Sequence, residues 1–160
     1  MPTLYQASEF LKQYIKAKEG CAKWDEAAQR YIPYADGGGL STIGYGHLIT
    51  HSEVERGLFN QGLTPVGCDI LFQSDLRVQV NLVNSLNILD LTQGQFDALV
   101  DFCWNCGFKA LNAALHERVS KFPDHCIHYI HNARGIIEPG LVNRRKDEVS
   151  WWYETTTDAA

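Results

Sequence analysis

The sequence predicts an α+β fold that is predominantly helical, with a small β-hairpin lobe joined by a long helix to a helical C-terminal lobe. Three observations lead to this prediction. A glycine-rich turn at 37–39 lies between β-branched and aromatic residues. A long stretch with helical spacing of apolar residues begins at Thr64-Pro65. After residue 91, helix start and stop signals recur to the end of the chain.

Length and composition favour one globular domain over residues 1–160. The chain is 45% hydrophobic, enough for one buried core, and it is too short for two ordinary domains. No apolar run approaches the ~20 residues of a membrane span, and the N-terminus lacks the charged start and apolar block of a signal peptide. We therefore expect a cytoplasmic protein with no stable membrane insertion.

Local signals place the first helix and the small lobe. Thr3 and Gln6 have capping-box spacing, and apolar residues then recur at helical intervals until Gly20, so a helix is expected over 3–18. Glu19 would project from its end into a groove. The small lobe is expected over about 19–63, with a hairpin in residues 30–50.

The rest of the chain is expected to be helical. Thr64-Pro65 predicts an N-cap followed by proline at the first helical position, opening a linking helix over about 65–87. Thr92 and Gln95 repeat the capping-box spacing before a central buried helix that ends at Gly107. The helical lobe, about 91–153, should then contain shorter helices near 111–119 and 124–132 and a last helix from Pro139.

Charge and cysteine content restrict the possible partners. The formal net charge is -5, from 14 basic and 19 acidic residues, which argues against nucleic acid. Five cysteines, an odd number without framework spacing, are expected to be reduced. Cys103 and Cys106 form a C-x-x-C, but they lie in an apolar helical pattern and no second C-x-x-C accompanies them, so packing is favoured over metal or redox use.

Two carboxylates and a hydroxyl are candidates for glycosidic bond hydrolysis. This reaction needs a protonated acid beside the leaving oxygen and, for inversion, a second carboxylate that activates water. Glu19 lies at a helix end near apolar residues, which favours the acid form, whereas Asp36 beside exposed glycines should be ionised. Thr42, six residues after Asp36, could direct its hydroxyl to the same water.

A structural interpretation competes with this one. Glu19 can be a solvated helix-end acid, Asp36 a turn residue that stabilises its own backbone, and Thr42 a strand former. On spacing alone the structural interpretation is favoured.

Three separated motifs, taken together, resemble a known family. They are Glu19-Gly20 with Tyr34-Ala35-Asp36 and Thr42-Ile43-Gly44-Tyr45-Gly46-His47, then Leu91 to Leu99 leading to Trp104-Asn105-Cys106-Gly107, and Gly140 to Arg145 with Glu148 and Trp151. In this order they resemble the phage-type lysozymes (endolysins, muramidases) of glycoside hydrolase family 24. The resemblance covers roughly residues 3 to 153.

The resemblance implies a lysozyme-like enzyme with its cleft between the two lobes. It would cut the β-1,4 bond between N-acetylmuramic acid and N-acetylglucosamine in peptidoglycan. By motif, Glu19 would be the general acid, Asp36 the carboxylate that orients or activates water, and Thr42 its hydroxyl partner. Residues expected to bind substrate or support the site are Tyr34, Gly46, His47, Asn105, Arg144 and Arg145. One of the two arginines is expected to reach the region of the acid, and His47 to hold the hairpin rather than to catalyse.

One departure from the family creates a rival acid. Glu19 and Asp36 enclose sixteen residues, whereas the family places its two carboxylates closer together. Glu26, with nine residues between it and Asp36, is therefore a rival. We favour Glu19 because of its adjacent glycine and helix end, and because an insertion of about eight residues costs little in a surface loop. Within the insertion, Cys21 to Gln29, Trp24 could stack on sugar or anchor a lid.

No cofactor is implied. His125, His128 and His131 recur at threes on the helix expected near 124–132, but zinc sites favour i, i+4 spacing, so no metal site is expected. The expected partner is peptidoglycan. We expect a monomer that depends on a holin to leave the host cytoplasm for the periplasm and cell wall. A lytic transglycosylase acting on the same bond and a non-catalytic wall-binding domain are the alternatives.

Overall fold

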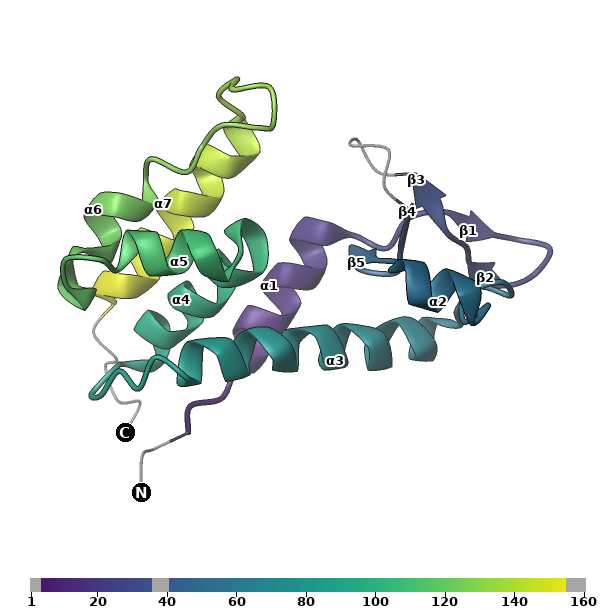
Figure 1. Ribbon diagram of the computed structural model, residues 1–160, viewed down its shortest axis with the longest axis horizontal. Helices are drawn as coiled ribbons and strands as arrows, with labels where there is room; N and C mark the ends of the chain where they lie inside the picture. The colour runs from purple at the N-terminus through teal and green to yellow at the C-terminus, as the bar shows by residue number, and fades with distance from the viewer. Residues whose placement is uncertain (1–3, 36–40, 155–160) are drawn as a thin grey trace. The chain divides into compact units, whose positions relative to one another are not determined.

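The computed structural model describes residues 4–35 and 41–154 (Figure 1). Helices make up most of it, with two small antiparallel sheets, as the sequence predicts. In chain order the elements are α1 (Glu9–Glu19), β1 (Trp24–Asp25), β2 (Arg30–Tyr31), β3 (Tyr34–Ala35), β4 (Ser41–Ile43), β5 (His47–Leu48), α2 (His51–Glu55), α3 (Pro65–Asn84), α4 (Gln93–Cys106), α5 (Phe108–Ala114), a 3-10 turn (Val119–Lys121), α6 (Phe122–Cys126) and α7 (Pro139–Tyr153).

The chain divides into two compact units. The small unit is Lys12–Val78, and the helical unit is Met1–Leu11 with Gln79–Ala160. The boundaries fall within α1 and α3, so the small unit is larger than the lobe expected over 19–63.

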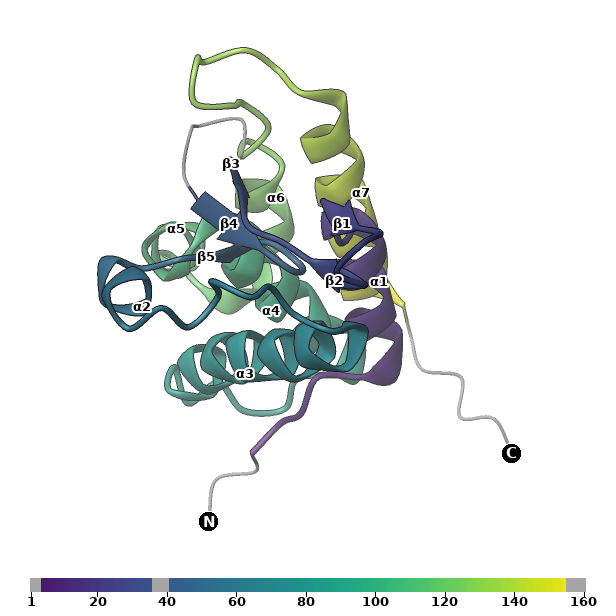
Figure 2. The same ribbon diagram turned by 90° about the vertical axis from the view of Figure 1, so that its right-hand side faces the viewer.

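The small unit contains the predicted hairpin, extended by a third strand (Figure 2). Strands β3, β4 and β5 form an antiparallel sheet in which Thr42 is paired with Tyr34 on one side and Leu48 on the other. β4 and β5 are joined by the turn Gly44-Tyr45-Gly46, whose two glycines have positive φ, 62° and 80°. Such backbone is costly for other residues, so these glycines are what permits the turn. Ile43 and Ile15 of α1 are fully buried.

The expected insertion, Cys21 to Gln29, and the two residues after it form a second hairpin, β1–β2. Its register pairs Trp24 with Tyr31, and their rings meet edge to face at 4.9 Å. The hairpin is tied down because Tyr31 exchanges two backbone hydrogen bonds, both 2.8 Å, with Leu63. A side chain at Gly62 would come within 2.4 Å of the Tyr31 carbonyl oxygen, so only glycine permits this approach. The insertion is therefore a folded element with its own anchor.

The helical unit is built around α4, as predicted. Thr92 and Gln95 form the complete capping box, and Gly107, with φ of 88°, ends the helix. α4 packs on α7, and Gly94 permits a close approach, since a Cβ there would lie 2.4 Å from the Trp151 carbonyl oxygen. The buried core of this unit includes Phe96, Leu99, Val100, Phe102, Leu111, Phe122, Trp151 and Trp152.

The first helix begins later than the sequence predicts. It starts at Glu9 instead of Thr3, a residue that lies outside the described ones. Ser8 is the reason: its Oγ accepts a hydrogen bond from the Leu11 N–H at 3.0 Å, which is N-cap geometry, and donates one to Asp97 of α4. The Thr3–Gln6 spacing was a false capping signal because a cap with a tertiary partner lies five residues further on.

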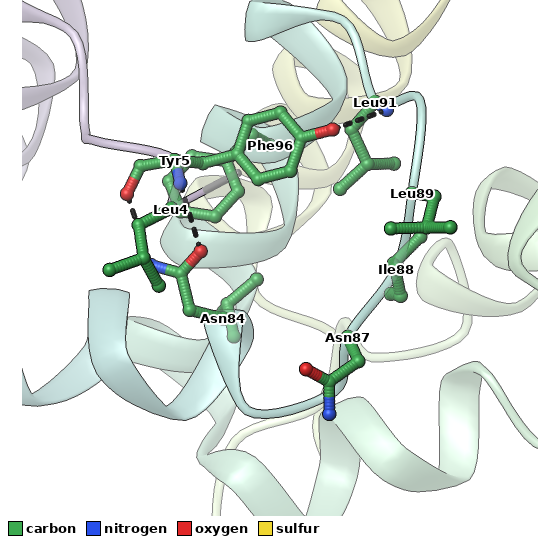
Figure 3. Close-up of a pocket in the computed structure, with 9 residues that line it drawn as sticks. Leu4, Tyr5, Asn84, Asn87, Ile88, Leu89, Leu91 and Phe96 are labelled. Carbon is green, nitrogen blue, oxygen red and sulfur yellow. Dashed lines mark hydrogen bonds between the residues drawn. The ribbon is translucent and has the colours of Figure 1, made fainter. Parts of the chain in front are cut away.

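Residues 4–7, which precede Ser8 and belong to no helix or strand, pack within the helical unit. Tyr5 exchanges backbone hydrogen bonds with the Asn84 side chain, and its hydroxyl accepts from the Leu91 N–H at 2.9 Å (Figure 3). The Tyr5 ring stacks on Phe96. The pocket lined by these residues holds about 30 Å³, room for a water molecule or two but not for a sugar ring.

Other helix boundaries also shift. Thr64 and Pro65 open α3 as predicted, with the Thr64 hydroxyl accepting from the Gly67 N–H, but the helix ends at Asn84 instead of about 87. The two short helices end early, α5 at Ala114 and α6 at Cys126. The prediction of one helix carrying His125, His128 and His131 was wrong, since only His125 is helical. Among the helices of residues 4–35 and 41–154, none combines the length and the apolarity needed to cross a bilayer.

Candidate active site

The end of α1 and the β4–β5 turn meet at Glu19 and Gly46. A Cβ built at Gly46 would lie 3.2 Å from Glu19 Oε2, so the carboxylate rests directly against the backbone of this turn. Glu19 is the last residue of α1, and Gly20, with φ of 63°, turns the chain away after it. Glu19 is half-buried, while Gly46 is exposed. A rigid helix end thus presents a carboxylate beside the glycine motif at a place that solvent reaches.

The hairpin carries the other two predicted catalytic residues. Thr42 is in the middle of β4 and only 5% exposed, and its register partner Tyr34 is half-buried on β3. Directly opposed residues of an antiparallel pair project from the same face, so these two side chains are neighbours. Asp36 follows β3 and lies outside the described residues.

His47 joins three elements of the small unit. One ring nitrogen, Nδ1, is 2.9 Å from Asp75 Oδ2 on α3, and Nε2 is 3.1 Å from Glu53 Oε1 on α2. The hydrogen bond with Asp75 raises the pKa of His47 above its ordinary value; burial opposes this, and Glu53 adds to it. Burial also acts against ionised Glu53, but hydrogen bonds from Thr50 and His47 outweigh it, and its pKa is lowered. His47 therefore clamps the hairpin to α2 and α3.

Glu26 has surroundings that differ from those of Glu19. It is exposed on the β1–β2 turn, where Oε2 accepts a hydrogen bond of 2.8 Å from Trp24 Nε1 and Oε1 accepts one from Gln29 Nε2. The Glu26 carboxylate orients the indole ring of Trp24, and Trp24 is itself exposed. Both carboxylate oxygens are thus used in contacts within the hairpin, which suits a structural role.

The two arginines of the C-terminal motif have carboxylate partners within the helical unit. Arg144 donates from Nε and Nη2 to both oxygens of Asp101, at 2.9 and 2.8 Å. Arg145 donates at 2.6 Å to Glu148 and at 2.9 Å to Asn105 Oδ1. Asp101 and Glu148 are fully buried and the arginines nearly so. Asn105 and Arg145, predicted together as supporting residues, are in contact; that either arginine reaches the acid stays a prediction.

Sequence reasoning missed the partners of these residues. Glu53 and Asp75 hold His47, and Asp101 holds Arg144. Two signals were available: Thr50 and Glu53 have capping-box spacing, and the box is complete. Asp101 is a charge within the apolar run from Leu99 to Cys103, which indicates a buried partner.

Cysteines and histidines show no metal-binding arrangement. In the described part of the chain, no three His, Cys, Asp or Glu side chains converge as ligands would. Cys103 is buried and directs its thiol to Gln79, while Cys106 receives a hydrogen bond from Arg145 Nη1 at 2.7 Å. Each sulfur of the C-x-x-C thus has a different partner.

Comparison with known proteins decides the family. The phage lysozyme family matches residues 23–148. The chain belongs to the phage lysozyme family. This match begins after Glu19 and includes Glu26, so it does not choose between the two acids.

Two relatives described as endolysins agree with the assignment of the chain to the phage lysozyme family. The endolysin of Bacillus phage PZA is 32% identical over 117 residues, which cover 67% of this chain and 42% of that protein. The endolysin of Bacillus phage B103 is also 32% identical, over 112 residues and 41% of its length. The chain thus spans about two fifths of the length of these curated relatives.

Solved structures share the fold. The muramidase domain of SpmX from Asticaccaulis excentricus is 28% identical, with a TM-score of 0.73 over 94% of this chain and 99% of that one. A P22 lysozyme mutant is 21% identical, with a TM-score of 0.67 over 94% and 99% of the two chains. These likenesses confirm the predicted lysozyme-like α+β class.

Proposed function

We propose that this chain hydrolyses the β-1,4 bond between N-acetylmuramic acid and N-acetylglucosamine in bacterial peptidoglycan. Support comes from the family, from relatives described as endolysins, and from the muramidase domain among the similar structures. The observation on which the proposal depends is the contact of Glu19 with Gly46. This contact places the Glu19 carboxylate, at the end of α1, beside the turn that follows β4, the strand that contains Thr42.

In the proposed reaction, Glu19 in its acid form donates a proton to the leaving glycosidic oxygen. Asp36 orients and deprotonates a water that attacks the anomeric carbon from the opposite face, and the Thr42 hydroxyl helps to hold that water. Bond cleavage and water addition then invert the anomeric centre. Glu19 suits the acid role because it is half-buried at a rigid helix end and its carboxylate lies against the glycine turn at Gly46.

Two matched substitutions test the acid. Lysis of permeabilised Gram-negative cells, followed by turbidity, should fall roughly 10²- to 10⁴-fold in Glu19→Gln, because a general acid contributes about that factor. Glu26→Gln should remain within about twofold, since surface changes away from a site have little effect. Full activity of Glu19→Gln, or its loss in Glu26→Gln alone, would reverse the assignment.

The products separate hydrolysis from lytic transglycosylation. Hydrolysis adds water and leaves reducing N-acetylmuramic acid ends, whereas transglycosylation leaves anhydro-sugars. We expect mass spectrometry of digested sacculi to find reducing ends. Anhydro ends would show a transglycosylase, and binding to sacculi without release of any fragment would show a wall-binding domain.

Access to the wall is a further part of the proposal. We propose that the protein accumulates as a monomer in the host cytoplasm and reaches peptidoglycan through a holin-type membrane lesion, which the resemblance to the phage-type lysozymes implies. Cells expressing it alone should stay intact and lyse when chloroform opens the inner membrane. Spontaneous lysis at equal expression would contradict the holin dependence.

A further inference from the structure

Two thiols face one another next to the proposed acid. Cys21 Sγ and Cys68 Sγ lie 3.6 Å apart, although the residues are 47 positions apart in the chain. Both belong to the small unit and neither is bonded to another sulfur. A disulfide needs about 2.05 Å between the sulfurs, so rotation about the side-chain bonds and a shift of about 1.5 Å would close it.

Secondary structure holds both cysteines in place. Cys21 follows Glu19-Gly20, where the positive φ of Gly20 turns the chain out of α1. Cys68 is in the first turn of α3 and 1% exposed, with its sulfur 3.6 Å from where a Cβ of Gly44 would be. Cys21 is half-buried, so a small oxidant can reach its sulfur first.

The other three thiols have partners of a different kind. Cys103 donates to the side-chain amide oxygen of Gln79, Cys106 lies against Arg145, and Cys126 donates to the backbone carbonyl of Pro123. Within the described residues, these contacts make Cys21 and Cys68 the pair arranged for sulfur–sulfur chemistry. Simple packing would explain a single buried cysteine on α3 but not a second thiol aimed at it from the end of α1.

We propose that Cys21 and Cys68 are an oxidative modification site, at which a disulfide-bearing oxidant forms an intramolecular disulfide. The Cys21 thiolate attacks the oxidant disulfide and releases one thiol from it, leaving a mixed disulfide on Cys21. Cys68 then loses its proton, attacks the Cys21 sulfur and releases the second thiol. The two protein thiols are oxidised by two electrons, and the oxidant disulfide is reduced to two thiols.

The surroundings of Cys21 and Cys68 make formation of the disulfide slow. Burial, with the neighbouring Cys68 adding to it, raises the pKa of Cys21 to about 12, and burial also raises the pKa of Cys68. Little thiolate forms at neutral pH, so the pair is protected in a reducing cytoplasm. If the protein is released as proposed above, it meets the oxidising periplasm, where the crosslink can form. The chemistry itself does not depend on that proposal.

The crosslink would join the segment after Glu19 to α3 and close a long loop. Loops of this length lose considerable entropy in the unfolded state when they are crosslinked. We expect the thermal midpoint of the oxidised chain to exceed that of the reduced chain by on the order of 10 °C.

The test uses the purified full chain with glutathione disulfide at pH 8.5, without denaturant, followed by alkylation and mass spectrometry. We expect loss of two hydrogen atoms per chain and a tryptic crosslink between peptides 19–23 and 57–77. Cys21→Ser and Cys68→Ser should each abolish it, and Cys106→Ser should not. These readouts need no lytic activity, so they stand if the proposed function fails.

Three results would overturn the proposal. They are two alkylated thiols at Cys21 and Cys68 after prolonged oxidation, a glutathione adduct on Cys21 that never resolves, and a crosslink to another cysteine. An unchanged thermal midpoint in a chain shown to be crosslinked would overturn the expected stabilisation.

Discussion

The two units use their motif carboxylates in opposite ways. Glu19 in the small unit is half-buried against an exposed glycine, whereas Glu148 in the helical unit is fully buried and bonded to Arg145 at 2.6 Å. Burial, reinforced by Asp101 and opposed by Arg145, raises the pKa of Glu148 well above its ordinary value. Glu19 thus lies at a surface that solvent reaches, whereas Glu148 is enclosed with Arg145 of the same helix, which also donates to Asn105 of α4. The comparison teaches that a motif residue's surroundings, not its residue type, indicate its role.

The largest expected effect comes from leaving Glu148 without its partner. Arg145→Met should lower the free energy of unfolding by about 3 to 5 kcal/mol, because it removes the cation from a buried carboxylate. Urea unfolding followed by circular dichroism measures the change. Lys146→Met, at the exposed neighbouring position, should stay within about 0.5 kcal/mol. A loss below about 1 kcal/mol in Arg145→Met would show that the pair is not structural.

Gly46→Ala should affect activity more than folding. A Cβ there must displace the Glu19 carboxylate by a few tenths of an ångström, so lysis should slow by about 10- to 100-fold, since small misplacements are costly at a catalytic group. Its positive φ adds about 1 to 2 kcal/mol of strain. Gly44→Ala is the matched control, because its φ is also positive but its Cβ meets Cys68 at ordinary contact distance. Equal slowing in both variants would mean that strain alone is responsible.

His47 should make the stability of the small unit depend on pH. Its folded pKa is raised, so its charged hydrogen bonds stabilise fully below the unfolded pKa, about 6.5, and are lost as the pH rises through the folded value. His47→Gln should therefore cost about 1 to 2 kcal/mol at pH 5.5 and clearly less at pH 9. Urea titrations at the two pH values give the difference. A cost that does not change with pH would show that the imidazole is not titrating in this range.

The smallest expected effect concerns Trp24. It is 40% exposed, and Tyr31 and Glu26 hold its ring in one orientation. If it stacks on sugar, Trp24→Ala should raise KM for sacculi by about 3- to 10-fold with little change in kcat, consistent with about 0.5 to 1.5 kcal/mol per aromatic contact. Trp24→Phe keeps an aromatic face and should recover most of the loss. If KM is unchanged and only stability falls, Trp24 is an anchor of the hairpin.

Local signals in the sequence were reliable where neighbours in the chain decide the structure. Thr92 with Gln95, Thr64 with Pro65, and Pro139 all opened helices as predicted, because a cap bonds to its own first turn. The glycines around Thr42 likewise predicted the hairpin. Thr3 failed because Ser8 makes a better cap through Asp97, a partner that local spacing cannot identify.

By itself, the sequence determined the fold class, the order of the main elements and the motif residues of the candidate site. Only the tertiary structure decided which residues separated in the chain meet: Glu19 with Gly46, His47 with Asp75, and Arg144 with Asp101. It also folded the insertion into an anchored hairpin that holds Glu26 beside Trp24. The physical reason is that hydrophobic periodicity specifies which face is buried, while the partner of a polar side chain depends on how the buried faces pack.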